Sequence, residues 1–215
     1  MRNQHDRRGL EIVDRVSEML AQGKVQDAEE LLILNKVEAV ATSDRVRLEL
    51  IMSELISLYC TEEPRRYREA EEVSLEREML RQDASSRWQT AMLLFYSARD
   101  PVRAAAKARE AVEMSKGQQE LVTLYSSICL LGLISTKLRQ NDEAISLLGE
   151  LEEFIYSDAA KSGTRRFAVG SETPFLEALK ERNLARDQVE RIALALAPLC
   201  RDPSFAKRLS LLASS

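Results

Sequence analysis

Glycine and proline are scarce in this sequence. Seven glycines and five prolines together make about 6% of the 215 residues, which is half of average usage. The chain also contains no Asn-Gly, Asp-Gly or Gly-Gly pair, the dipeptides that most often close β-hairpins. This shortage argues against an all-β fold. It argues equally against an enzyme built on glycine-rich phosphate-binding loops.

Histidine and cysteine are scarce as well. His5 is the one histidine, and it lies in a polar N-terminal stretch where a Ser–His or Cys–His couple would lack an anchored base. Cys60, Cys129 and Cys200 are widely spaced and include no Cys-x-x-Cys pair, which argues against disulfides and a zinc site. No G-x-G-x-x-G, G-x-x-x-x-G-K-[ST] or H-E-x-x-H motif occurs. We therefore expect no catalytic residues, no metal and no cofactor, and predict that the protein is not an enzyme.

Long apolar runs are missing too. The longest nearly apolar runs, 192–200 and 128–134, are far shorter than the ~20 residues that span a bilayer. The first residues are charged and polar, without an apolar stretch of signal-peptide length. We infer a protein of the reducing cytoplasm with no membrane partner.

The charge is modest and uneven. A formal net charge of −4 argues against a protein whose whole surface binds nucleic acid. Residues 161–215, however, hold ten Lys and Arg against six Asp and Glu, a net charge of +4, so residues 1–160 carry −8. The C-terminal part therefore differs electrostatically from the rest of the chain.

Apolar residues recur at three- and four-residue steps almost from end to end, which is the spacing of amphipathic helices. Ile12, Val16 and Met19 mark the first helix. Gly23 is expected to end it, because glycine takes the left-handed conformation at helix C-termini. A second helix begins at about Gln26, and the short connection predicts that the two helices are antiparallel neighbours.

The same helix–turn–helix unit occurs three more times. We expect Ser43 to cap the first helix of the second unit, and Asp100 and Pro101 to open the second helix of the third, which ends at Gly117. The second helices open on small residues whose spacings of 42, 34 and 40 define the repeat: Ala28, Ala70, Ala104 and Ala144. Periods of this size are typical of helical solenoids.

The repeats end near residue 157. Residues 158–172 are small and polar, include two glycines, and are predicted to be a loop. The helices predicted within 173–215 no longer follow the repeat spacing. We expect them to cap the stack formed by residues 1–157 and to pack on the same solenoid.

These units resemble tetratricopeptide repeats. The fourth unit follows that family's pattern at Ile128, Leu131, Gly132, Ser135, Ala144, Leu148 and Leu151. The third follows it at Trp88, Ala91, Met92, Phe95, Ala104, Ala108 and Ala111. The resemblance covers about residues 9–157 and implies an all-α, right-handed solenoid of antiparallel helix hairpins. A stack of helical hairpins from another family, in a different register, is the alternative.

In the tetratricopeptide family the first helices line a concave groove that binds a peptide or a partner helix. The resemblance would place ten side chains in that groove: Val13, Ser17, Ser53, Ser57, Gln89, Leu93, Tyr96, Cys129, Leu133 and Thr136. The set contains no Lys, Arg or Asn, so it suits an apolar or helical segment better than an acidic C-terminus. The alternative is that adjoining helices fill this face.

Two further features concern charged partners. Arg165 and Arg166 in the predicted loop could dock an acidic partner or a phosphate. If the first two C-terminal helices formed a helix-turn-helix, Arg186, Gln188 and Arg191 would face nucleic acid, although acidic residues lie among them.

The sequence thus predicts a protein-interaction scaffold or chaperone-like adaptor that binds a peptide or helix in a mostly uncharged groove. The alternative is a regulator whose solenoid senses a peptide or protein and whose basic C-terminal helices contact nucleic acid. The sequence leaves the oligomeric state open.

Overall fold

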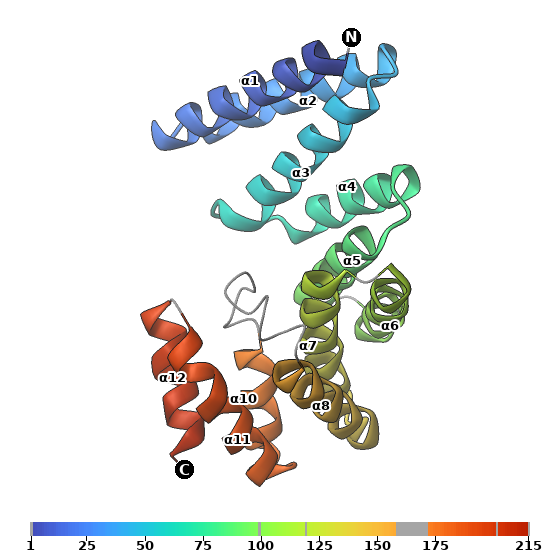
Figure 1. Cartoon of the computed structure of the whole chain (residues 1–215). Helices are drawn as coiled ribbons and strands as arrows, with labels where there is room; N and C mark the ends of the chain where they lie inside the picture. The colour runs from blue at the N-terminus through green and yellow to red at the C-terminus, as the bar shows by residue number, and fades with distance from the viewer. Residues whose placement is uncertain (1, 99, 119, 158–171, 201, 215) are drawn as a thin grey trace. The chain divides into compact units, whose positions relative to one another are not determined.

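The computed structural model describes residues 2–98, 100–118, 120–157, 172–200 and 202–214, with the backbone alone for residues 2–8 and 118. Throughout this described part the regular elements are helices, as predicted. In chain order (Figure 1) they are α1 (Arg2–Ala21), α2 (Val25–Ala41), α3 (Arg45–Thr61), α4 (Tyr67–Leu80), α5 (Ala84–Tyr96), α6 (Pro101–Gln118), α7 (Leu121–Lys137), α8 (Asn141–Tyr156), α10 (Thr173–Glu181), α11 (Arg186–Leu196), the short 3₁₀ helix η2 (Ala197–Leu199) and α12 (Pro203–Ala213).

The chain divides into two compact units, an N-terminal unit of residues 1–82 and a C-terminal unit of residues 83–215. In the N-terminal unit α1 packs on both α2 and α3, α2 packs on α3, and α3 packs on α4. In the C-terminal unit α5 packs on both α6 and α7, and α7 packs on α8. Within α1–α4 and within α5–α8 each helix therefore contacts its neighbours in sequence, and the first helix of the first pair also contacts the first helix of the second pair.

Helix boundaries follow the local signals with two corrections. Gly23 has a φ of +72°, the left-handed conformation expected beyond the end of α1. Ser43 is not the cap of α3: its φ of +54° places it in the preceding turn, and the carboxylate of Asp44 accepts the backbone N–H of Arg47 at 3.2 Å. Gly117 does not end α6, which continues to Gln118.

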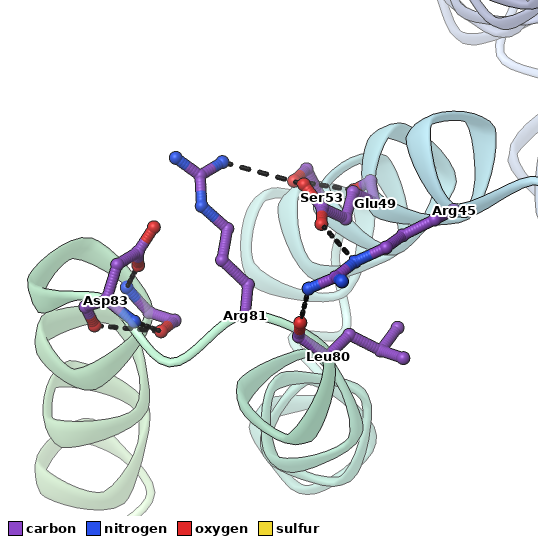
Figure 2. Close-up of polar contacts among 7 residues, drawn as sticks. Arg45, Glu49, Ser53, Leu80, Arg81 and Asp83 are labelled. Carbon is purple, nitrogen blue, oxygen red and sulfur yellow. Dashed lines mark hydrogen bonds and ion pairs between the residues drawn. The ribbon is translucent and has the colours of Figure 1, made fainter.

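The end of α4 is held against the start of α3 in the N-terminal unit (Figure 2). Arg45 donates a hydrogen bond to the carbonyl oxygen of Leu80, one of the terminal carbonyls that α4 cannot satisfy itself. Arg81 lies 3.6 Å from Glu49, a carboxylate that also pairs with Arg45 at 3.4 Å. The two helices are therefore joined by polar contacts at this end as well as by their buried apolar faces.

The C-terminal helices pack on the last hairpin of the C-terminal unit. Helix α10 packs on α7, α11 contacts α8, and α12 packs on α10 and α11. Phe175 of α10 is fully buried, and its ring lies where a Cβ on Gly132 of α7 would be. Gly132 therefore permits the close approach of these two helices.

Asp83 makes the N-terminal cap of α5. Its side chain accepts the N–H of Ser86 at 2.8 Å, and its own N–H is donated to the Ser86 hydroxyl at 3.3 Å, a reciprocal capping box.

We expect Asp83→Ala to lower the free energy of unfolding of the C-terminal unit by about 1 kcal/mol. Urea denaturation followed by circular dichroism measures the change. Exposed Gln82 provides the control, and equal stabilities of Asp83→Ala and Gln82→Ala would contradict the prediction.

Candidate partner-binding groove

The side chains predicted to line a concave groove differ widely in exposure. Ser17, Ser57 and Tyr96 are exposed, and Val13, Ser53 and Gln89 are partly buried. The remaining members are buried: Leu93, Cys129, Leu133 and Thr136. The predicted positions on α7 therefore do not line an open groove.

The C-terminal segment covers this part of α7. Phe175 of α10 packs against Gly132, in the middle of the predicted positions. Arg182, at the end of α10, donates a hydrogen bond of 2.6 Å to the carbonyl oxygen of Thr136. On α7, therefore, α10 of the same chain packs on the helix to which the resemblance assigned part of the groove.

Of the residues predicted to meet charged partners, those of α11 contact acidic side chains of the same chain. Arg165 and Arg166 lie outside the described residues. Gln188 donates to Glu152 at 2.7 Å, Arg191 lies 3.1 Å from the same carboxylate, and Arg186 lies 3.0 Å from Glu190. These side chains are engaged by acidic groups of their own chain, which weakens the case for a nucleic-acid surface.

The described part of the chain has neither a metal-binding cluster nor a membrane-spanning helix. There, no cluster of three or more His, Cys, Asp or Glu side chains is arranged to hold a metal ion. Among the same residues, no helix combines the length and the apolar character needed to cross a bilayer.

An open groove of about 450 Å³ lies in the N-terminal unit between α2, α3 and α4. We call it the N-terminal groove or, from the two helices that flank it, the α2–α4 groove. Its apolar lining comes from all three helices: Ile33, Val37, Val40, Leu55, Tyr59 and Val73. Its charged lining comes from α2 and α4: Lys36, Glu69, Glu72 and Glu76. The groove therefore combines an apolar floor with a mostly acidic wall.

Helix α2 contributes apolar side chains that its own unit leaves exposed. Ile33, Val37 and Val40 are 44%, 62% and 58% exposed, while Leu32 and Ala39 on the inner face are fully buried. A helix that is apolar on its outer as well as its inner face is typical of one that is covered on both sides. We call Ile33, Val37 and Val40 the apolar stripe of α2.

The acidic wall runs along one side of α4. Glu69, Glu72 and Glu76 recur at three- and four-residue steps, so they share a helix face. Glu72 pairs with Arg68 of the same helix at 3.3 Å, and Glu76 pairs across the groove with Lys36. The lining thus holds three carboxylates and one ammonium group.

A hydrogen-bonded network positions the groove floor. Glu29 of α2 accepts a hydrogen bond of 3.0 Å from the Tyr59 hydroxyl and two, of 2.9 and 2.8 Å, from Arg66 at the start of α4. The Arg66 guanidinium also lies 4.4 Å above the centre of the Tyr59 ring. Three helices are therefore joined by one carboxylate, which we call the Glu29 network.

The Glu29 network shifts the pKa values of its members. Hydrogen bonds from Arg66 hold the pKa of Glu29 below its ordinary value, despite the opposing effect of burial. Burial, reinforced by the Glu29 carboxylate, raises the pKa of Tyr59 to about 12. Tyr59 thus stays a neutral hydrogen-bond donor at physiological pH.

A comparable groove of about 300 Å³ lies in the C-terminal unit between α6, α7 and α8. Arg109 of α6 donates hydrogen bonds of 2.6 and 2.8 Å to the two carboxylate oxygens of Glu143 on α8. Lys116 of α6 lies 2.9 Å from Glu150. Cations of one helix therefore meet the carboxylates of the other across this groove.

The two grooves can be aligned residue by residue. Each flanking helix has a fully buried alanine near its start, and these alanines set the register: Ala28 and Ala104, Ala70 and Ala144. Five and twelve residues beyond them, α6 has Arg109 and Lys116, whereas α2 has Ile33 and Val40. The two cross-groove cations of the C-terminal unit are thus apolar side chains in the N-terminal unit.

The carboxylates, in contrast, are present in both grooves. One residue before and six residues beyond its alanine, α8 has Glu143 and Glu150, and α4 has Glu69 and Glu76. The N-terminal groove therefore keeps both carboxylates without the cations that α6 provides at these two positions, and Glu76 pairs with Lys36 instead.

The sequence pattern does not predict this groove, because the family resemblance places binding on the first helices of the hairpins alone. The signal was nevertheless present, since Ile33, Val37 and Val40 lie off the inner face that Ala28 and Leu32 define. Which of the two apolar faces of α2 would stay exposed depended on the packing of α3 and α4.

Comparison with known proteins adds no relative. No protein-family model, curated protein or solved structure matches the chain.

Proposed function

We propose that this protein is a protein-interaction scaffold or adaptor of the cytoplasm that binds a peptide or helix of another protein. We further propose that it is built as a right-handed solenoid of antiparallel hairpins similar to tetratricopeptide repeats. The packing of first helices on first helices, α1 on α3 and α5 on α7, supports this architecture.

The observation that carries the proposed function is the apolar stripe of α2 beside an open groove. Ile33, Val37 and Val40 are each about half exposed and line one cavity together. Full burial of an aliphatic side chain contributes ~1.5–3 kcal/mol, so covering three half-exposed ones contributes ~3 kcal/mol. That is less than the ~4 kcal/mol of a millimolar complex, so a specific partner would have to make polar contacts as well.

The site differs from the one that the sequence predicts. The predicted positions on α7 are buried and α10 packs on that helix, so we assign partner binding to the second helices α2 and α4 rather than to a continuous face of first helices. The exposed serines of α1 and α3, Ser17 and Ser57, are not needed for this proposal.

The test is affinity capture of partners from the native host with quantitative mass spectrometry. We expect Val37→Asp with Val40→Asp to reduce partner recovery at least tenfold, because two carboxylates would have to be desolvated on the apolar stripe. Val102→Asp with Val122→Asp is the matched control, since these valines of α6 and α7 are 68% and 51% exposed and line neither groove.

Circular dichroism and thermal melting establish that both double variants remain folded. Recovery of the same partners in the same amounts by wild type and both variants would refute the assignment of binding to the α2–α4 groove.

A further inference from the structure

We infer that the α2–α4 groove binds a basic amphipathic helix of another protein. Two Lys or Arg side chains of that helix, seven residues apart, pair with Glu69 and Glu76. Its apolar side chains cover the apolar stripe of α2. This inference rests on the proposed function and specifies the chemistry of the partner.

The spacing of the partner's cations follows from α4. Glu69 and Glu76 are seven residues apart, about two helical turns or ~10.5 Å along the axis. In the C-terminal groove the corresponding carboxylates, Glu143 and Glu150, are met by Arg109 and Lys116, which are also seven residues apart on one helix. Helix α6 therefore shows that a helix with cations at this spacing can match such a pair of carboxylates.

The carboxylates of the N-terminal groove retain capacity for such contacts. Glu76 pairs with Lys36 but is 55% exposed, and a carboxylate can accept several hydrogen bonds at its two oxygens. Glu69 lies in the groove lining at the position of Glu143, and Ile33 occupies the position of its partner Arg109. A bound segment would therefore supply cations at the two places where α2 has the apolar side chains Ile33 and Val40 and α6 has Arg109 and Lys116.

The charge of the lining selects among possible occupants. The lining holds three carboxylates and one ammonium group, and Arg68 beside the groove pairs with Glu72; the remaining negative charge favours a basic segment over an acidic peptide or a phosphate backbone. A second copy joined groove to groove would bring two acidic walls together, because a two-fold contact places the same surface on both sides. Charge complementarity thus favours a basic helix from another protein.

The experiment titrates the full-length protein into fluorescein-labelled synthetic helical peptides and measures fluorescence anisotropy. One peptide carries leucine anchors with Arg and Lys seven residues apart on the same face. A second replaces both cations with Glu, and a third replaces the leucines with Ser. We expect saturable binding of the first peptide, at least tenfold weaker binding of the other two, and loss of affinity with added salt.

Two protein variants locate the contacts. Glu69→Gln with Glu76→Gln should weaken binding of the basic peptide about tenfold and reduce its salt dependence. Ile33→Arg with Val40→Lys places the cations of α6 in α2, where they should pair with Glu69 and Glu76 and abolish binding. Val102→Arg with Val122→Lys adds the same charges outside both grooves and should bind as wild type does.

The outcomes separate this inference from the proposed function. Equal binding of the basic and acidic peptides, or no binding of either while Val37→Asp with Val40→Asp still loses native partners, would overturn the basic helix and leave the interaction groove standing. A concentration-dependent dimer that Ile33→Arg with Val40→Lys dissociates, measured by analytical ultracentrifugation, would overturn it in favour of a second copy. Native partner recovery that is unaffected by Val37→Asp with Val40→Asp would refute the proposed function itself.

Discussion

Gly132→Ala is expected to destabilise the C-terminal unit by about 2–3 kcal/mol, although the same substitution in an exposed helix is stabilising. A Cβ at this position of α7 would approach three atoms of the Phe175 ring to less than 3.0 Å. Phe175 is fully buried, so its ring can move away only by separating α10 from α7 or disturbing the core around it.

Gly149→Ala provides the matched control for Gly132→Ala. Gly149 lies inside α8, and nothing lies within 4 Å of a Cβ built on it. Replacing it should leave the stability unchanged or raise it by up to about 1 kcal/mol, the gain in helix propensity. Guanidinium denaturation of both variants measures the change in the free energy of unfolding, which should be a decrease for Gly132→Ala and zero or an increase for Gly149→Ala.

A second substitution tests whether overlap with the Phe175 ring causes the loss of stability in Gly132→Ala. Phe175→Leu should be less harmful in the Gly132→Ala background than in the wild type, because the smaller side chain relieves the overlap. If Gly132→Ala were as stable as the wild type, the close packing of α10 on α7 would be wrong. The explanation for the buried α7 positions would fail with it.

Glu29→Ala is expected to destabilise the N-terminal unit by about 2 kcal/mol. The substitution removes the acceptor of the buried Tyr59 hydroxyl and of both Arg66 hydrogen bonds. Arg66 is 32% exposed, so solvent screens part of its interaction, and a double-mutant cycle with Arg66→Ala should give a coupling energy of about 1 kcal/mol.

The Glu29 network also predicts a pH dependence. Because Arg66 lowers the pKa of Glu29 in the folded state, the carboxylate stabilises the unit above the ordinary Glu pKa of 4.5. This contribution is lost as the pH falls through the lowered value. Urea midpoints between pH 7 and pH 3 should therefore fall less steeply for Glu29→Gln than for wild type.

Glu30→Gln is the control for the pH experiment, because Glu30 is an exposed neighbour on the same helix. Its midpoints should follow those of the wild type. Identical pH profiles for Glu29→Gln and wild type would show that ionisation of Glu29 does not contribute to the pH dependence of stability.

Much of the fold could be predicted because its signals are local. The caps at Asp100 and Asp202, each followed by proline, open α6 and α12 as their chemistry requires. The prediction that Ser43 caps α3 was wrong because Ser43 and Asp44 are adjacent and both residue types can cap a helix. Only the backbone conformation shows which of them precedes the first helical turn. A choice between neighbours of similar chemistry is decided by the path of the turn.

The candidate site was less predictable because accessibility is not a local property. Cys129 and Leu133 occupy helix positions that, from sequence, would face a groove, yet both are buried in a helix on which the distant segment α10 packs. Ile33 and Val40 show the reverse, since these apolar side chains are left exposed beside α4 although the family resemblance does not mark them as a binding surface. The ion pairs of the C-terminal groove show what the equivalent positions of α6 do when they carry charged side chains.

By themselves, the few glycines and prolines, the repeated alanines and the apolar spacing determined that the described chain is helical and where most of its helices begin and end. These properties depend on backbone conformation and capping within a few residues, which the sequence encodes directly. Only the tertiary structure decided which helix faces are covered, that α10 fills the face of α7, and that α2 exposes an apolar stripe beside Glu69 and Glu76. Burial depends on the packing of segments distant in sequence, and helical periodicity identifies an apolar face without identifying what covers it.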